Sequence, residues 1–203
     1  MNVYPTHTNR GFLLRETLLL AARLRQGATW DELEHDALHG DLLESRSVAT
    51  RRTLFRALRE RLEQAPSELL DLLDTQAQET KVLTVLCLIL HGHPLLTELL
   101  LEAVRPAHLA LQPQLKLADL TAWAAGKRLS ELHLQRLTDA TYGRTLSGLT
   151  SLLGQVGLLE REKGGFRIRA PFLPSALRHA LLALGWSRER LALLDSHPLG
   201  TPL

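Results

Sequence analysis

The sequence predicts a mostly α-helical protein, and three observations support that prediction. Leucine, a strong helix former, supplies 51 of the 203 residues. Aromatic residues, which favour strands, make up only 4 %. Apolar side chains also recur at three- and four-residue spacing along most of the chain. With 45 % hydrophobic and 23 % charged residues, the composition is that of a folded globular protein rather than a disordered chain or a membrane bundle.

The first half of the chain contains a series of helix signals and no strand signal. Gly27 is suited to end the first helix, because glycine adopts the left-handed conformation found just past helix C-termini. Thr29 and Glu32 have the spacing of a capping box, which starts the second helix. A later helix is apolar nearly all round and is expected at the buried centre of a bundle. The expected helices span residues 10–26, 30–38, 47–64, 67–73, 76–91 and 95–104.

The last third combines helices with one predicted β-hairpin. Segments 158–162 and 166–170 flank Lys163-Gly164-Gly165, and alternation around a glycine pair indicates a hairpin. Pro106 and Pro113 flank a stretch that we expect to be looser, so we place a domain boundary there, between domains 1–105 and 116–203. The remaining expected helices are 118–125, ended by Gly126, then 130–139, 142–156, 175–184 and a short terminal one.

The order helix, short turn, Leu-rich helix, glycine and basic hairpin is that of a winged helix-turn-helix. In this interpretation residues 130–139 are the supporting helix and 142–156 the recognition helix. The predicted architecture is therefore a helical N-terminal domain followed by a winged-helix-like domain with one small hairpin.

The charge is distributed unevenly, although the net charge is only +2. Residues 66–104 carry a net charge of −5, whereas residues 105–203 carry +6. Positive charge is concentrated in 45–61 and 140–180, and 20 of the 24 basic residues are arginines. Such clusters predict an acidic partner, of which nucleic acid is the commonest.

The winged-helix interpretation supplies the first set of candidate contacts with double-stranded DNA. A helix fits the major groove and a basic hairpin can lie against the neighbouring phosphates. Because the helix is poor in the side chains that read bases, phosphate contacts with little sequence specificity are expected. The alternative is a protein-interaction module whose hairpin arginines are merely solvated. The candidate residues are Arg144, Thr145, Arg161, Lys163, Arg167 and Arg169.

The Arg-rich helix near 47–64 supplies a second candidate surface. Its first turns combine cations with the exposed amides and positive dipole end that favour phosphate. The alternative is a solvated face paired with the acidic stretch from Glu68 to Glu79. The candidate residues are Arg46, Ser47, Thr50, Arg51, Arg52, Arg56 and Arg59.

No enzymatic motif is found in the sequence, and no cofactor is expected. Cys87 is the single cysteine, so it forms no disulfide within the chain, and its apolar helix should keep the thiol inert. His35 with His39, and Cys87 with His91 and His93, match no known zinc spacing, so no metal site is expected. The longest apolar stretch, 82–90, is far below the roughly 20 residues that cross a bilayer. We therefore expect a cytoplasmic protein without a membrane partner.

Several short motifs resemble the BrxA family of BREX (bacteriophage exclusion) phage-defence systems. They are the opening Gly11-Phe12-Leu13-Leu14-Arg15-Glu16, Trp30 with Leu33, Arg46-Ser47-Val48-Ala49-Thr50-Arg51-Arg52, and the late Leu-rich helix leading into Gly157-Leu158-Leu159. The resemblance implies a non-enzymatic component of a phage-resistance system, with a helical fold likened to the NusB antitermination factors and with binding to double-stranded DNA. Other BREX proteins are further candidate partners.

Two other functions remain open at this stage. The protein could be an adaptor that assembles the defence complex through apolar helices and the acidic 66–104 face, which a large exposed leucine patch would favour. It could also bind RNA in the manner of antitermination factors, although the poverty of aromatic residues argues against single-stranded RNA.

Overall fold

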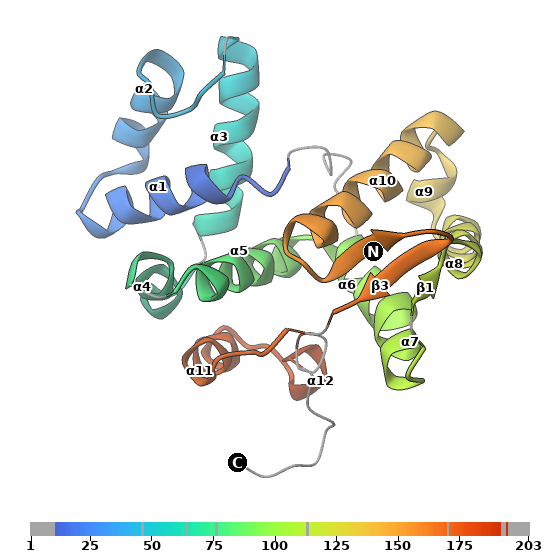
Figure 1. Ribbon diagram of the computed structural model, residues 1–203. Helices are drawn as coiled ribbons and strands as arrows, with labels where there is room; N and C mark the ends of the chain where they lie inside the picture. The colour runs from blue at the N-terminus through green and yellow to red at the C-terminus, as the bar shows by residue number, and fades with distance from the viewer. Residues whose placement is uncertain are drawn as a thin grey trace. The chain divides into compact units, whose positions relative to one another are not determined.

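The structure, a computed structural model, consists of two compact units. We call Phe12–Gly92 with Leu173–Trp186 the N-terminal unit, and the part built around His93–Phe172 the central unit. The prediction of a mostly α-helical fold is confirmed, with one small antiparallel sheet (Figure 1). The residues that the structure describes are 11–45, 47–63, 65–75, 77–112, 114–169, 171–191 and 194.

The N-terminal unit is helical and is organised around one buried helix, α5. Every residue of α5 from Leu83 to Leu90 is buried. Helices α1, α3, α4 and α11 all contact it, so the prediction that the apolar helix forms a bundle centre is confirmed. The helices of this unit are α1 (Leu14–Arg25), α2 (Trp30–His39), α3 (Val48–Leu62), α4 (Ser67–Thr75), α5 (Gln78–Gly92) and α11 (Ser175–Ala183).

Local signals set the end of α1 and the start of α2 as the sequence predicted, although α1 begins at Leu14 rather than at residue 10. Gly27 adopts φ 90° just past α1, the left-handed conformation that terminates a helix. The Thr29 hydroxyl accepts a hydrogen bond from the Glu32 amide, and the Glu32 carboxylate accepts one from the Thr29 amide at 2.8 Å. This capping box satisfies two backbone donors that the start of α2 would otherwise leave unpaired.

The central unit combines helices with a three-stranded sheet. Strands β2 and β3 pair antiparallel, and β1 pairs with the other edge of β3, which gives the order β1-β3-β2. The elements are α6 (Pro94–Leu99), the π-helix η2 (Leu100–Val104), α7 (Arg105–Leu109), β1 (Leu115–Lys116), α8 (Leu117–Ser130), α9 (Leu132–Gln135), α10 (Asp139–Gln155), β2 (Leu159–Glu162), β3 (Gly165–Ile168) and α12 (Arg188–Leu191).

The predicted hairpin is present, and its two glycines have different roles. Glu162 pairs with Gly165, so Lys163 and Gly164 form a two-residue turn in which Gly164 adopts φ 88°. Gly165 lies against β1, where an added Cβ would sit 2.2 Å from the Leu115 carbonyl oxygen. Strand β1 can therefore approach β3 only because residue 165 lacks a side chain. No pattern in the sequence predicted β1.

Two helix predictions for this unit were wrong. Gly126 does not end a helix, because α8 continues to Ser130; an added Cβ at Gly126 would meet no atom within 4 Å. Residues 130–139 do not form one helix either, because Glu131 is extended and α9 is only four residues long. The side chain of Gln135 donates to the Leu129 carbonyl at 2.7 Å, and that of Arg128 donates to the Leu137 carbonyl at 2.8 Å. Side chains thus bind carbonyls of the residues that flank α9 on both sides.

Contacts between residues divide the chain into two units whose boundaries differ from those of the expected domains, 1–105 and 116–203. The change between units falls at Gly92–His93, and Leu173–Trp186 packs with the N-terminal unit. Pro106 does not loosen the chain, because it lies in the first turn of α7, where a missing amide hydrogen costs little. Residues 100–104, just before Pro106, form a π-helix. This stretch contains the carbonyl four residues before the proline, to which an ordinary residue would donate in an α-helix and to which proline, which has no amide hydrogen, cannot.

Among the described residues, no single helix has both the length and the apolarity to span a bilayer. The segments Gln78–Gly92 and Pro94–Leu109 pass that test only when they are taken together.

Candidate nucleic-acid interface

The first candidate surface belongs to the segment from β1 to β3 of the central unit. Along the chain it consists of a strand, three helices and a hairpin that pairs with the first strand. Thr138 caps α10 by accepting a hydrogen bond from the Thr141 amide at 3.2 Å. Arg128 of α8 fixes the start of α10, because its guanidinium binds Asp139 at 2.5 Å and stacks 5.4 Å from the centre of the Tyr142 ring.

The solvent-facing side of α10 is made of small and polar residues. Its exposed positions follow helical spacing, and their mostly short side chains leave the helix surface open to close approach. Arg144 is the only cation of α10; its Nε donates to the Ala140 carbonyl at 3.2 Å, and the residue remains exposed. The other exposed residues between the ends of the helix are Ala140, Gly143, Ser147, Ser151 and Gly154.

Thr145 does not lie on that surface, which corrects one predicted contact. It is only 6 % exposed, and its hydroxyl donates to the Thr141 carbonyl at 3.0 Å. A residue at position 145 faces the core because it follows buried Tyr142 by three positions and precedes buried Leu149 by four.

The hairpin carries four cations, of which two are paired. Arg169 binds Glu160, and Arg167 binds Glu162. The pairing with Arg169 lowers the pKa of Glu160 below its usual value, chiefly through the hydrogen bonds to the guanidinium and then through its charge. Arg161 and Lys163 are exposed, and no ion pair of either side chain occurs among the described residues. These two cations are the ones available to a phosphate without breaking a pair.

One cation that sequence analysis missed also lies on this sheet. Lys116 is exposed in β1 and pairs in register with Gly165 of β3. A two-residue strand gives no alternation pattern to detect. The signal that could have revealed it is Gly165, a second glycine next to a turn that needs only one.

The second candidate surface is the outer face of α3 in the N-terminal unit. Arg52 and Arg56 are exposed, and no ion pair of either occurs within the described parts of the chain. Ser47 caps the helix by accepting from the Thr50 amide at 3.5 Å, so one of the amides expected to face phosphate is already engaged. Thr50 is exposed in the first turn. Arg46 lies outside the described residues.

Two other arginines of α3 are partly committed to the fold. Arg51 donates from Nη1 to the Gly40 carbonyl at 3.2 Å, which connects α3 to the end of α2. Arg59 lies 5.5 Å from the centre of the Trp30 ring and pairs with Glu63 at 3.3 Å. In the part of the chain that the structure describes, no ion pair joins these arginines to the acidic stretch of α4, where Arg25 of α1 pairs with Asp71 and Asp74 instead.

No metal-binding group is found among the residues with described positions. His35 and His39 lie close together, with ring centres 5.1 Å apart, but no cluster there reaches three His, Cys, Asp or Glu side chains. Cys87 is buried in α5, as expected for an inert thiol.

Comparisons with known proteins give a family match and a match to solved structures. The profile of a family described as BrxA matches residues 6–185. A crystal structure of an uncharacterized protein from Magnetospirillum magneticum is similar, with a TM-score of 0.77 and 18 % sequence identity, over 94 % of this chain and 97 % of that one. None of the curated proteins matches the sequence. At this identity the structural match supports the fold alone.

Proposed function

Because the chain belongs to the BrxA family, we propose that it is a cytoplasmic, non-enzymatic accessory component of a BREX phage-resistance system that binds double-stranded DNA. BrxA is not a known enzyme family, and the family supports an association with BREX and phage defence. The DNA-binding part of the proposal rests on the surface of the β1-to-β3 segment.

The topology of that segment supports a winged-helix module. Strand β1, helices α8, α9 and α10, and the β2–β3 hairpin follow one another in the order of that motif, with β1 completing the sheet. In this assignment α10 is the recognition helix and the hairpin is the wing. For the N-terminal unit, the likeness to NusB remains an expectation from the family resemblance.

The observation that carries the proposal is the chemistry of α10 and the hairpin together. The exposed side of α10 is small and polar, so its backbone could approach the edges of the major groove closely. Arg144, Arg161 and Lys163 would contact phosphates, and these cations need not leave an acidic partner to do so. Since the exposed side chains of α10 offer little hydrogen bonding to bases, phosphate contacts would dominate and sequence specificity would be low.

The α3 surface would contribute a second set of phosphate contacts, mainly through Arg52 and Arg56. Arg51 and Arg59 are less available because each already has partners within the N-terminal unit. Arg167 and Arg169 would contribute only if a phosphate displaced their carboxylate partners.

A mobility-shift titration tests this function. The probes are a short DNA duplex of unrelated sequence, an RNA duplex of the same length, and their single strands, each at low and at physiological ionic strength. Salt-sensitive binding to duplex DNA irrespective of sequence is the expected result. Preference for RNA would favour the antitermination-like alternative, and absence of binding to every probe would refute nucleic-acid binding.

A specific observation favours a second candidate function, that of a protein-interaction adaptor. Exposed leucines are concentrated in the central unit, at Leu101, Leu109, Leu111, Leu117, Leu129 and Leu132, and Leu111 is 89 % exposed. Where such side chains form one contiguous apolar patch, that patch is typical of an interaction site. If the adaptor function holds, co-purification with the other BREX proteins should be lost in Leu109→Ser/Leu111→Ser and retained in Arg144→Gln/Lys163→Gln. The opposite pattern would refute it.

A further inference from the structure

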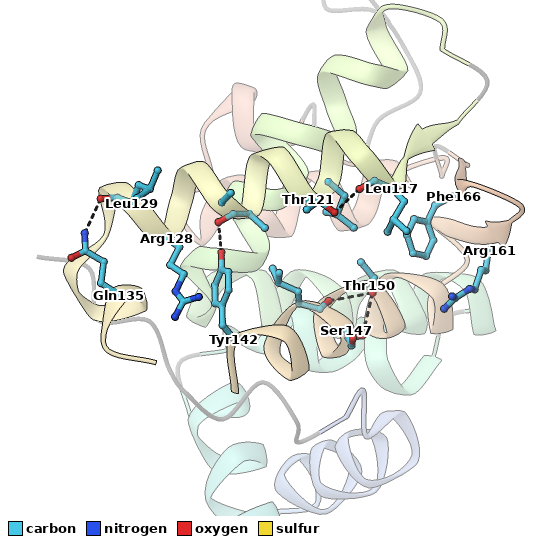
Figure 2. A pocket seen from close by; sticks show the side chains of 14 residues that line it. Leu117, Thr121, Arg128, Leu129, Gln135, Tyr142, Ser147, Thr150, Arg161 and Phe166 are labelled. Atoms are coloured by element: carbon cyan, nitrogen blue, oxygen red, sulfur yellow. Dashed lines mark hydrogen bonds between the residues drawn. The ribbon is translucent and has the colours of Figure 1, made fainter. Parts of the chain in front are cut away.

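Helices α8 and α10 of the central unit flank an apolar groove. It shares Arg161 with the proposed DNA surface and Leu117 and Leu129 with the exposed leucines, but neither proposed function uses its interior. Its volume is about 880 Å³, which lies within the range of small-molecule sites, about 300–1,000 Å³. Figure 2 shows the side chains of the two helices facing each other across it, with Phe166 and Arg161 of the hairpin at one end.

Two hydroxyl groups that line the groove are already engaged within their own helices. The Thr121 hydroxyl donates to the Leu117 carbonyl at 2.8 Å, and the Thr150 hydroxyl donates to the Leu146 and Ser147 carbonyls, both at 3.2 Å. Their hydrogens are therefore used within their own helices. On the α8 side, Leu117 and Leu129 are 55 % and 79 % exposed at the rim, and an occupant would shield them from water.

The two ends of the groove differ in whether the arginine there already has a partner. At one end, the Arg128 guanidinium is already engaged by Asp139 and by the Leu137 carbonyl. At the other end, the Arg161 guanidinium has neither an ion pair nor a hydrogen bond among the described residues. A ligand matched to this groove has a long apolar body and a single anionic end.

The spacing of the helices selects a slender ligand. The Tyr142 hydroxyl of α10 donates to the Ala124 carbonyl of α8 at 2.6 Å, so one tyrosine side chain spans the gap between the two backbones. An α-helix with its side chains is about 10–12 Å wide, too wide to enter between them. An extended alkyl chain is much narrower than a helix and can enter between them.

We propose that the groove between α8 and α10 binds a long-chain aliphatic carboxylate, with the carboxylate on Arg161 and the alkyl chain along Leu117, Phe166, Leu146 and Leu129. This site does not depend on DNA binding. Burial of the alkyl chain would supply most of the binding free energy, and one charge-assisted contact at the carboxylate end would orient the ligand.

Displacement of cis-parinaric acid, a fluorescent long-chain carboxylate, by dodecanoate below its micellar concentration tests the site in the full-length protein. Dodecanoate should compete saturably, and dodecan-1-ol, which lacks the charge, should compete about tenfold more weakly. Arg161→Gln should weaken dodecanoate by about tenfold and leave dodecan-1-ol unchanged. Arg56→Gln makes the same change of charge on α3 and should have no effect.

Filling the groove from either wall should abolish binding of both compounds. Ala125→Trp acts from α8 and Ser147→Phe acts from α10; both positions are exposed groove-lining residues, and circular dichroism shows whether each variant is folded. Undiminished binding to either folded variant would overturn the proposal. It would also be overturned if dodecyltrimethylammonium competed as well as dodecanoate, or if no carboxylate bound.

Discussion

Arg169 binds Glu160 across the two strands of the hairpin, with its Nε and Nη2 atoms 2.9 and 2.7 Å from the same carboxylate oxygen. Both side chains are more than half exposed, so the pair adds little to stability. Its larger effect concerns charge, because it removes one of the hairpin's four cations from the set available to a phosphate. The neighbouring pair of Arg167 with Glu162 removes a second cation in the same way.

Glu160→Gln should therefore strengthen binding to duplex DNA. It frees Arg169 and removes a charge that repels phosphate, so one additional contact should steepen the dependence of log K on log salt by about 0.9. Fluorescence anisotropy at several salt concentrations measures this. Glu44→Gln, which frees Arg15 in the N-terminal unit, is the matched control and should leave the slope unchanged. Weaker binding by Glu160→Gln would contradict the proposed role of the hairpin.

Gly165→Ala should destabilise the central unit by about 1–3 kcal/mol, because the new methyl group would overlap the Leu115 carbonyl and force β1 away from β3. Gly126→Ala adds the same atom in an exposed helix interior with free space around it, and should stabilise by up to about 1 kcal/mol. Urea denaturation of both variants gives the comparison. Equal effects at the two positions would show that β1 does not pair closely with β3.

His93 should make stability depend on pH between about 4 and 6.5. Burial lowers its pKa from 6.5 to about 4, so at intermediate pH the unfolded chain binds a proton that the folded protein does not. The contribution of neutral His93 to the free energy of unfolding is fully present above pH 6.5. It falls by about 3 kcal/mol in total as the pH is lowered toward 4.

His93→Asn isolates that contribution. Its side chain can still accept the hydrogen bond from the Leu96 amide that His93 Nδ1 accepts at 3.2 Å, but asparagine does not titrate in this range. Urea denaturation should show a smaller loss of stability in the variant between pH 6.5 and 4.5. The same loss in both proteins would assign the pH dependence to other groups.

Tyr142→Phe should destabilise the central unit by about 1 kcal/mol, because it removes the one hydrogen bond to the Ala124 carbonyl while keeping the ring. Thermal or urea denaturation measures the change. An unaltered midpoint would mean that the bond does not hold α8 to α10.

The parts of the fold that sequence predicted depend on neighbours in the chain. The Thr29–Glu32 capping box and the Lys163–Gly164 turn each need only residues within a few positions, so their patterns are visible in the sequence. The errors involve contacts from further away. Gly126 remains helical because α8 packs on other elements, which outweighs a cost of about 1 kcal/mol for a glycine. Strand β1 exists only because β3 is beside it.

The sequence predicted which charged residues make up the candidate site, but not which of them are free to contact a phosphate. The charge pattern identified the basic hairpin and α3. It could not show that Thr145 faces the core, that Arg167 and Arg169 hold carboxylates, or that Arg51 bonds to Gly40. These outcomes depend on which face packs inward and on acidic residues opposite in the folded chain.

The most direct test of the central claim is the salt dependence of duplex DNA binding in Arg144→Gln/Lys163→Gln. Arg161 is left unchanged because it also borders the groove. If both residues contact phosphate, the slope of log K against log salt should become shallower by about 1.8 relative to the unsubstituted protein. Arg15→Gln should leave the slope unaltered. An unchanged slope in the double variant would contradict DNA binding through α10 and the hairpin.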